Sequence, residues 1–138
     1  MTRISHRARA LAERGFTLIE LIVVMSLIVL LSSIGMIGYQ TSVKRGREAV
    51  LLEDLYRMRD AIDQFYVDKG KYPVDLTELV GSGYLRAVPV DPMTKSLESW
   101  QLIPAEPDPN NPSADIGIYN VKSGSEEQAI DGSKYADW

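Results

Sequence analysis

The sequence predicts an α+β protein in which a long N-terminal helix carries one small domain. The first observation is an apolar run over residues 16–38, which is long enough to cross a hydrocarbon core of about 30 Å as a helix. The second is a helical spacing of apolar residues over 41–68. The third is a pair of short segments, 100–103 and 116–121, in which β-branched and aromatic residues alternate with others, as in strands. A chain of 138 residues has room for one such domain beside the apolar helix.

One carboxylate interrupts the apolar run. Glu20 is the charged residue within 16–38, and Arg3, Arg7, Arg9 and Arg14 precede the run as a basic leader. An ionised side chain in a bilayer costs several kcal/mol, on the order of 3 in insertion experiments, unless it finds a partner. We therefore expect Glu20 to be functional and to require a cation.

The residues around this carboxylate resemble a known signal. Gly15-Phe16-Thr17-Leu18-Ile19-Glu20 is similar to the processing signal of type IV pilins and pseudopilins. The resemblance implies that a prepilin peptidase cuts between Gly15 and Phe16 and that Phe16 is then N-methylated. It also implies that Glu20 pairs with the N-terminal ammonium of a neighbouring subunit during filament assembly, since each buried charge is costly without the other.

The same resemblance divides the chain. It implies a leader over 1–15, a transmembrane and filament-core helix over 16–38, and a periplasmic head over 39–138. The implied location is the bacterial inner membrane, with the N-terminus cytoplasmic and the assembled filament in the cell envelope. The implied partners are further copies of the chain, other pseudopilins, the prepilin peptidase, an inner-membrane assembly platform, and membrane lipid before assembly.

Two other interpretations of the N-terminus exist. A secretory signal peptide has a shorter apolar region, followed by a small-residue cleavage site, whereas here the small residue precedes a longer run. A plain signal anchor fits the hydropathy equally well but gives no role to Glu20.

The helix is expected to continue beyond the membrane to about Lys69. No proline occurs between Phe16 and Tyr72, and such a helix would be about 80 Å long at 1.5 Å per residue. Gly35 and Gly38 are its expected weak points. The residues expected to form the core face of its second half are Ala49, Leu52, Leu55, Met58 or Arg59, Ile62, Phe65 and Tyr66.

Turn and capping signals define the next elements. Gly70 is expected to end the long helix, and Asp75 followed by Glu78 is the capping-box pattern of a short helix that Gly81 and Gly83 would end. Asp91 is expected to cap a turn.

Two of these segments extend the resemblance. The stretches 68–73 (Asp-Lys-Gly-Lys-Tyr-Pro) and 89–92 (Pro-Val-Asp-Pro) are similar to sequences of the major pseudopilins of type II secretion systems. The implied architecture is the pilin-like fold: a long helix, half transmembrane and half amphipathic, packed against a small antiparallel sheet. We expect that sheet to lie on Leu52, Leu55, Ile62 and Phe65.

The C-terminal segment has two interpretations. The acidic loop of major pseudopilins binds calcium, and the resemblance implies a calcium site here with Ser125, Asp131, Asp137 and nearby carbonyl oxygens as ligands. The alternative is an ordinary solvated tail held by Trp138.

Composition excludes several function classes. The chain has no cysteine, and its one histidine is His6 in the leader, so neither a cysteine nucleophile nor a histidine base is available to the remaining chain. The formal net charge of −4 disfavours nucleic acid as a partner. Composition thus argues against an enzyme, and the resemblance implies a structural subunit of a type II secretion pseudopilus. The alternatives are a type IV pilus subunit, for adhesion, motility or DNA uptake, and a membrane-tethered domain that does not polymerise; the missing cysteines favour the pseudopilin.

Overall fold

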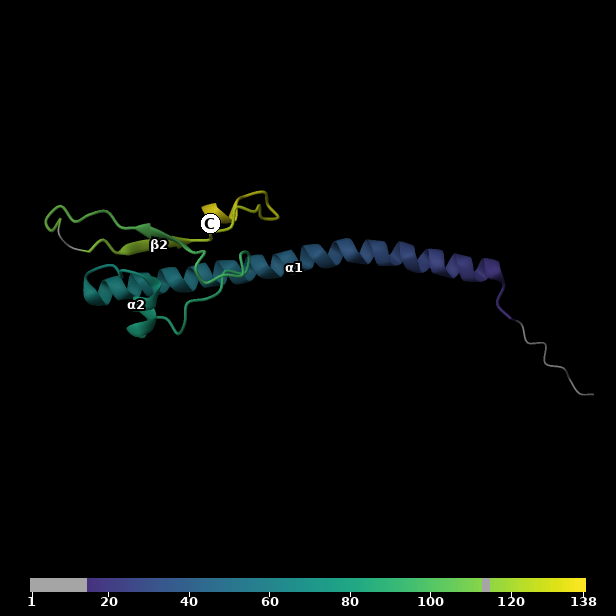
Figure 1. Cartoon of the computed structure of the whole chain (residues 1–138), viewed down its shortest axis with the longest axis horizontal. Helices are drawn as coiled ribbons and strands as arrows, with labels where there is room; N and C mark the ends of the chain where they lie inside the picture. The colour runs from purple at the N-terminus through teal and green to yellow at the C-terminus, as the bar shows by residue number, and fades with distance from the viewer. Residues whose placement is uncertain (1–14, 113–114) are drawn as a thin grey trace, which may run out of the picture. The chain divides into compact units, whose positions relative to one another are not determined.

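The protein has an α+β fold (Figure 1). The computed structural model describes residues 15–112 and 115–138, so the predicted leader lies outside the described residues except for Gly15. The chain divides into two compact units, the first ending at Tyr39 and the second comprising Gln40–Trp138. The elements are helices α1 (Leu18–Lys69) and α2 (Leu76–Gly81), strands β1 (Gln101–Pro104) and β2 (Ile118–Lys122), and the short 3-10 helix η1 (Tyr135–Asp137).

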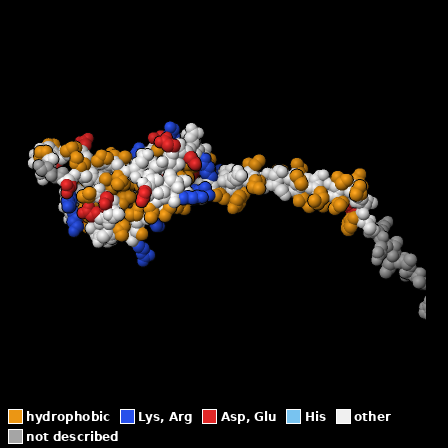
Figure 2. All heavy atoms as spheres, in the orientation of Figure 1, with side chains coloured by type: hydrophobic (Ala, Val, Ile, Leu, Met, Phe, Trp, Pro, Cys, Tyr) orange, Lys and Arg blue, Asp and Glu red, His pale blue; other side chains and the backbone are white. Residues whose placement is uncertain are grey.

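The first unit exposes its apolar side chains. Residues 16–39 are all exposed, from Phe16 at 87% to Val24 at 48%, and Figure 2 shows hydrophobic side chains over much of this segment. In the described part of the chain, α1 is the one helix long and apolar enough to cross a membrane. Water is a poor solvent for so large an apolar surface, so this segment requires lipid or protein around it.

In the second unit, one face of α1 forms the base of the core. The buried residues of this face are Leu51, Leu55, Met58, Ala61, Ile62 and Phe65. The predicted core face of α1 was partly wrong. Leu52 is 54% exposed, and Ala49 and Tyr66 are exposed too. Steps of four and three residues from Leu51 keep to one helix face, whereas two successive steps of three from Ala49 to Leu55 drift around the helix.

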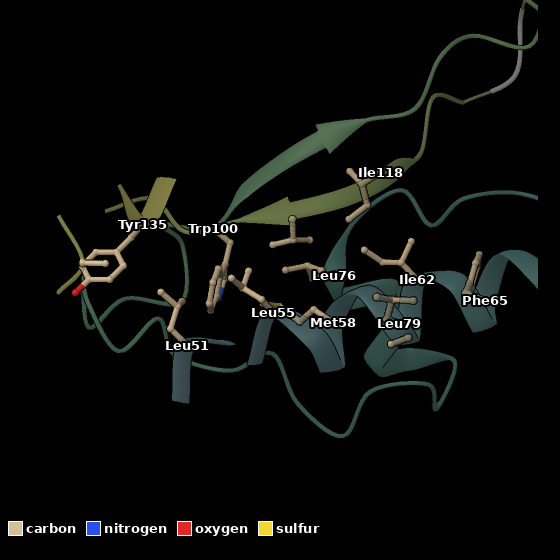
Figure 3. Close-up of a cluster of buried hydrophobic side chains, with 13 residues drawn as sticks. Leu51, Leu55, Met58, Ile62, Phe65, Leu76, Leu79, Trp100, Ile118 and Tyr135 are labelled. Atoms are coloured by element: carbon tan, nitrogen blue, oxygen red, sulfur yellow. The ribbon is translucent and has the colours of Figure 1, made fainter. Parts of the chain in front are cut away.

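The remaining core residues come from α2, β2 and the loops. Figure 3 shows the core side chains extending from Tyr135 at one end to Phe65 at the other. Those contributed outside α1 are Leu76, Leu79, Trp100, Ile118, Val121, Ala129 and Tyr135.

The predicted sheet is present as an antiparallel pair, β1 with β2, in which Gln101 pairs with Lys122. Only β2 faces the core, since Ile118 and Val121 are buried while β1 is largely exposed. Both strands begin later than predicted. Trp100 instead packs in the core just before β1 and donates its indole N–H to the carbonyl oxygen of Pro89 at 2.8 Å.

The predicted helix ends are confirmed. Gly70 has φ +69° and donates its amide to the carbonyl of Tyr66 at 2.8 Å, which closes α1. Asp75 caps α2 by accepting the amide of Glu78 at 2.8 Å. The Glu78 carboxylate in turn accepts the amide of Val74 at 2.7 Å, one residue before the position that the capping box describes.

Candidate processing and assembly site

The start of α1 brings the predicted processing and assembly residues together in sequence and structure. Gly15, Phe16 and Thr17 are exposed and precede the helix, so the peptide bond between Gly15 and Phe16 is not part of it. The Thr17 hydroxyl oxygen accepts the amide of Glu20 at 3.3 Å. Thr17 therefore caps the helix, a role that the Thr-x-x-Glu pattern signals and that our sequence analysis missed.

Glu20 lies in the first turn of α1 with an exposed side chain. The ion pairs in the described part of the chain, Arg57–Glu53 and Lys134–Glu126, do not include it. A carboxylate near a helix N-terminus gains a modest stabilisation of about 0.3–1 kcal/mol from the helix dipole. That gain is smaller than the cost of placing the charge in lipid, so the helix end alone does not account for Glu20.

Two serines of the same segment, Ser26 and Ser33, differ from Glu20 in this respect. The Ser26 hydroxyl donates to the carbonyl of Ile22 at 2.7 Å, and the Ser33 hydroxyl donates to that of Val29 at 2.8 Å. Such bonds to the preceding turn satisfy a hydroxyl inside an apolar environment. The Glu20 carboxylate accepts no such bond, because backbone carbonyls of the preceding turn offer it no hydrogen.

Apolar side chains lie beside the exposed Glu20 carboxylate. Phe16, Leu18, Leu21 and Val24, with Thr17 and Glu20 itself, line an open hollow of about 570 Å³. An ion pair formed here by a cation from outside would be partly removed from water and correspondingly strengthened.

The three predicted calcium ligands occupy different settings in the C-terminal segment. Ser125 is buried, and its hydroxyl oxygen accepts the amide of Glu127 at 3.3 Å. Asp131 is exposed and accepts the amide and the hydroxyl of Ser133 at 2.9 and 2.6 Å, bonds that lower the pKa of Asp131. Asp137 is exposed in η1.

These side chains do not form a cluster of acidic ligands. Across residues 15–112 and 115–138, no group of three or more His, Asp or Glu side chains is placed to hold a metal ion. Calcium also accepts carbonyl and hydroxyl oxygens, so the donor chemistry of the segment suits the ion. A calcium site at this loop would depend on backbone carbonyls for most of its ligands.

The C-terminal segment is not a solvated tail, which corrects the alternative expectation. Ala129 and Tyr135 are buried in the core, and residues 128 and 134 pair as a β-bridge. The Glu48 carboxylate of α1 accepts the amide of Ile130 and the hydroxyl of Tyr135, each at 2.8 Å. Burial of the phenol raises the pKa of Tyr135, and the hydrogen bond to Glu48 is the second cause of this rise.

Two cations of α1 complete this attachment. Lys44 donates to the carbonyl of Gln128 at 2.6 Å. Arg59 donates to the Asn120 side-chain oxygen at 2.8 Å, to the carbonyl of Val121 at 2.9 Å and to that of Trp138 at 2.7 Å. The sequence analysis named Arg59 as the alternative to Met58 on the core face but predicted no contact for it or for Lys44. A cation within an otherwise apolar stripe was the visible signal for the role of Arg59.

The prediction that Asp91 caps a turn is confirmed. One oxygen of this fully buried carboxylate accepts the amides of Met93 and Thr94 at 2.8 and 3.4 Å. The other accepts the buried hydroxyl of Ser123 at 2.6 Å. Asp91 therefore joins its turn to the segment that follows β2.

The fold and the N-terminal site together resemble those of a pilin-like subunit, and in the described residues one helix is long and apolar enough to span a membrane. Residues 11–36 match the family described as the prokaryotic N-terminal methylation motif. The chain is 35% identical over 63 residues to the fimbrial protein EcpC of Eikenella corrodens, a match that covers 46% of this chain and 41% of that protein. It is 33% identical over 67 residues to the type IV major pilin protein PilE1 of Neisseria gonorrhoeae, covering 47% and 39% of the two chains.

The matches are confined to part of each protein. A fimbrial protein of Neisseria meningitidis is likewise 31% identical over 67 residues, covering 47% of this chain and 38% of that protein. The chain thus spans about two-fifths of the length of the curated relatives that it matches. No solved structure matches. The relatives named here are fimbrial proteins and a type IV major pilin, and the chain is similar to them over 63 to 67 residues.

Proposed function

We propose that the protein is a subunit of a type II secretion pseudopilus. Prepilin peptidase removes residues 1–15, Phe16 is methylated, and the mature subunit is held in the inner membrane until it is extracted into a short filament that drives protein export. Its partners are further copies of itself, other pseudopilins and the inner-membrane assembly platform. The observation that carries the proposal is Glu20, a carboxylate without an ion-pair partner in the described chain, four residues after the predicted new N-terminus and inside an exposed apolar helix.

The assembly step follows from charge. Cleavage before Phe16 creates an ammonium group at the start of the apolar segment, and methylation leaves it protonated. In lipid the ammonium and the Glu20 carboxylate of a neighbouring copy are each costly alone and tolerable when paired. The pair would thereby set the register between adjacent helices.

Features of the second unit favour the pseudopilin over a surface pilin. The chain has no cysteine with which to close a C-terminal loop. Its Tyr72-Pro73 and Pro89–Pro92 elements resemble those of major pseudopilins, and Asp91 in the latter joins two loops through Ser123. The alternative, a type IV pilus subunit, is supported by the pilin relatives.

A first experiment measures processing. The intact mass of the protein recovered from membranes should show loss of residues 1–15 and gain of one methyl group. An uncut chain would overturn the proposal, because no new ammonium group would then be available to Glu20.

A second experiment measures assembly. Glu20→Ala should be inserted and cleaved but should fail to form filaments in sheared-cell fractions. Ser26→Ala is the matched control, since it removes a polar group from the same helix whose bond to Ile22 is internal. Normal filaments from Glu20→Ala would favour the membrane-tethered domain instead.

A third experiment separates the two filament systems. Deletion of the gene should abolish export of secreted proteins while leaving surface pili, twitching and DNA uptake intact. Loss of surface pili with normal export would assign the protein to a type IV pilus.

Calcium at the C-terminal loop is part of the same proposal. Calcium should raise the thermal unfolding temperature of the mature protein over that in a chelator, and magnesium should not, because calcium accepts the irregular carbonyl-rich coordination available here. Asp131→Asn should abolish the shift. An unfolding temperature that does not respond to calcium would remove the ion from the proposal.

A further inference from the structure

Three tyrosines lie close together near the end of α1. They are Tyr66 in this helix, Tyr72 just after it and Tyr119 in β2. The rings of Tyr66 and Tyr72 are stacked, with centroids 4.4 Å apart and planes at 24°. Tyr119 meets Tyr72 edge to face, with centroids 6.5 Å apart and planes at 66°. Tyr66 and Tyr119 are each 45% exposed, so this aromatic group is part of the surface.

Two of these rings line a hollow in the second unit. Tyr72 and Tyr119, together with Ala105 and Glu106 after β1, surround an open space of about 410 Å³. We call this space the tyrosine hollow. Tyr66 does not line it but covers one face of the Tyr72 ring, and so restricts the movement of that ring.

Backbone contacts hold the walls of the hollow together. The Ile118 amide donates to the Pro73 carbonyl at 2.8 Å, beside Tyr119 and Tyr72 in the sequence. The Ala105 amide donates to the Gly117 carbonyl at 2.8 Å. The segments that form the hollow are therefore positioned before a ligand arrives, which lowers the entropic cost of binding.

Glycine is required for this arrangement at position 117. A Cβ atom there would lie 2.5 Å from both the Cβ and the carbonyl oxygen of Tyr72. Gly117 therefore allows the chain before β2 to lie directly against Tyr72, and this places Tyr119 near the Tyr72 ring.

The charge of the hollow is negative. Glu106 is exposed and takes part in neither of the ion pairs of the described residues, and neither does Lys71, which precedes Tyr72. The faces of the tyrosine rings add negative potential, because aromatic rings carry a quadrupole. The formal net charge of the chain, −4, has the same sign. A cation is therefore the ligand that this surface favours.

We propose that the tyrosine hollow binds the guanidinium group of an arginine side chain from another protein molecule. A guanidinium group is planar, stacks on aromatic faces and offers paired N–H donors to a carboxylate such as that of Glu106. A neutral sugar also stacks on tyrosine but makes no use of this charge. The inference requires neither cleavage at Gly15 nor filament assembly.

The guanidinium has two sources. One is a second copy of this chain, in which Arg45, Arg47 and Arg86 are exposed and take no part in the ion pairs of the described residues. The other is a different protein. Both present the same group, so the binding site is tested first and its source second.

The first experiment titrates the full chain, in a non-ionic detergent, with N-acetylargininamide. Nuclear magnetic resonance of ¹³C-labelled tyrosine rings reports binding, and Tyr72→Phe and Tyr119→Phe assign the two signals. We expect saturable shifts at both rings. N-acetylcitrullinamide has nearly the same shape without the charge and should bind at least about fivefold more weakly.

Variants test the carboxylate and the rings separately. Glu106→Gln should weaken binding about threefold, whereas Glu98→Gln, which removes the same charge from an exposed site outside the hollow, should leave binding unchanged. Tyr119→Leu should also weaken binding. Tyr119→Phe keeps the ring and should bind normally, which separates loss of stacking from loss of the fold.

Three results would overturn the inference. They are equal affinity for the arginine and citrulline probes, full binding by Glu106→Gln, and stronger binding of N-acetyllysinamide than of the arginine probe. Shifts at Tyr72 and Tyr119 with maltose but not with the arginine probe would assign the hollow to a sugar and overturn it as well.

Crosslinking in cells identifies the source of the arginine. The chain has no cysteine, so Ala105→Cys gives one attachment point in the hollow for a benzophenone maleimide. An adduct of two copies that weakens when Glu106→Gln is added supports a second copy as the source, and one of another mass that weakens in the same way supports a different protein. An adduct that is insensitive to Glu106→Gln, or no adduct, would overturn the inference. A chain that binds the arginine probe but is not cleaved removes only the proposed function.

Discussion

Tyr135 donates its phenolic hydrogen to the Glu48 carboxylate at 2.8 Å and thereby fixes the last element of the chain to helix α1. The two residues are 87 positions apart, and the Tyr135 side chain is fully buried. The same Glu48 oxygen also accepts the Ile130 amide. One carboxylate thus bonds two residues of the C-terminal segment and, with Lys44 and Arg59, holds that segment on the helix.

Replacing Tyr135 with Phe should destabilise the second unit by about 1–2 kcal/mol. The substitution keeps the buried ring and removes a hydrogen bond to a charged group. Chemical unfolding followed by circular dichroism measures the change. Tyr56→Phe is the control, since Tyr56 is 68% exposed and its loss should cost less than about 0.5 kcal/mol. Equal costs for the two variants would contradict the role of the Glu48 bond.

The same tyrosine predicts a pH dependence. Burial raises the pKa of Tyr135 above its ordinary value of about 10, so the folded protein holds the phenolic proton more tightly than the unfolded chain does. Its contribution to stability is complete below about pH 10 and is lost as the pH rises above that value. The free energy of unfolding should fall over this range in the unmodified protein and fall less in Tyr135→Phe. An identical slope in both proteins would be inconsistent with the buried phenol.

Local signals in the sequence were sufficient for the helix ends. Gly70 and the Asp75–Glu78 pair act within one turn of chain, and both hold their predicted roles. The capping role of Thr17 was equally local and could have been predicted from Glu20 three positions later. The Thr17-x-x-Glu20 capping pattern was not recognised because Glu20 had been assigned to subunit assembly.

Long-range contacts were not predictable in the same way. Neither the spacing nor the composition of the C-terminal segment shows that Glu48 and Lys44 accept and donate bonds there. The choice of Leu51 over Leu52 as a core residue also depends on which side the C-terminal segment packs. Periodicity fixes the existence of an apolar face, and the packing partner fixes its exact direction.

Replacing Arg59 with Ala should cost about 2–3 kcal/mol. Its guanidinium donates to Asn120, Val121 and Trp138, so the change leaves partly buried oxygens without a donor. Arg57→Ala is the matched control, two residues earlier in α1. The ion pair of Arg57 with Glu53 is largely exposed, so its loss should cost less than about 1 kcal/mol. Unfolding midpoints of the two variants give the comparison.

Replacing Asp91 with Ala should cost about 2–3 kcal/mol. The change leaves the buried Ser123 hydroxyl and the Met93 amide without their acceptor. Asp108 makes the same kind of turn, accepting the Asn110 amide at 2.8 Å, but it is exposed. Asp108→Ala should therefore cost less than about 1 kcal/mol, and a similar cost for both would show that burial does not matter at Asp91.

Replacing Gly124 with Ala should destabilise the protein by about 1–3 kcal/mol. A Cβ atom at this position would lie 1.9 Å from the carbonyl oxygen of Ser99, so the backbone of one of the two segments must move. Gly81 is the control, because a Cβ there meets nothing within 4 Å and Gly81→Ala at the end of α2 should be neutral or slightly stabilising. Hydrogen exchange should show the Gly124 variant opening first where residues 99 and 124 meet. Unchanged exchange there would mean that the close approach of these segments is not required for packing.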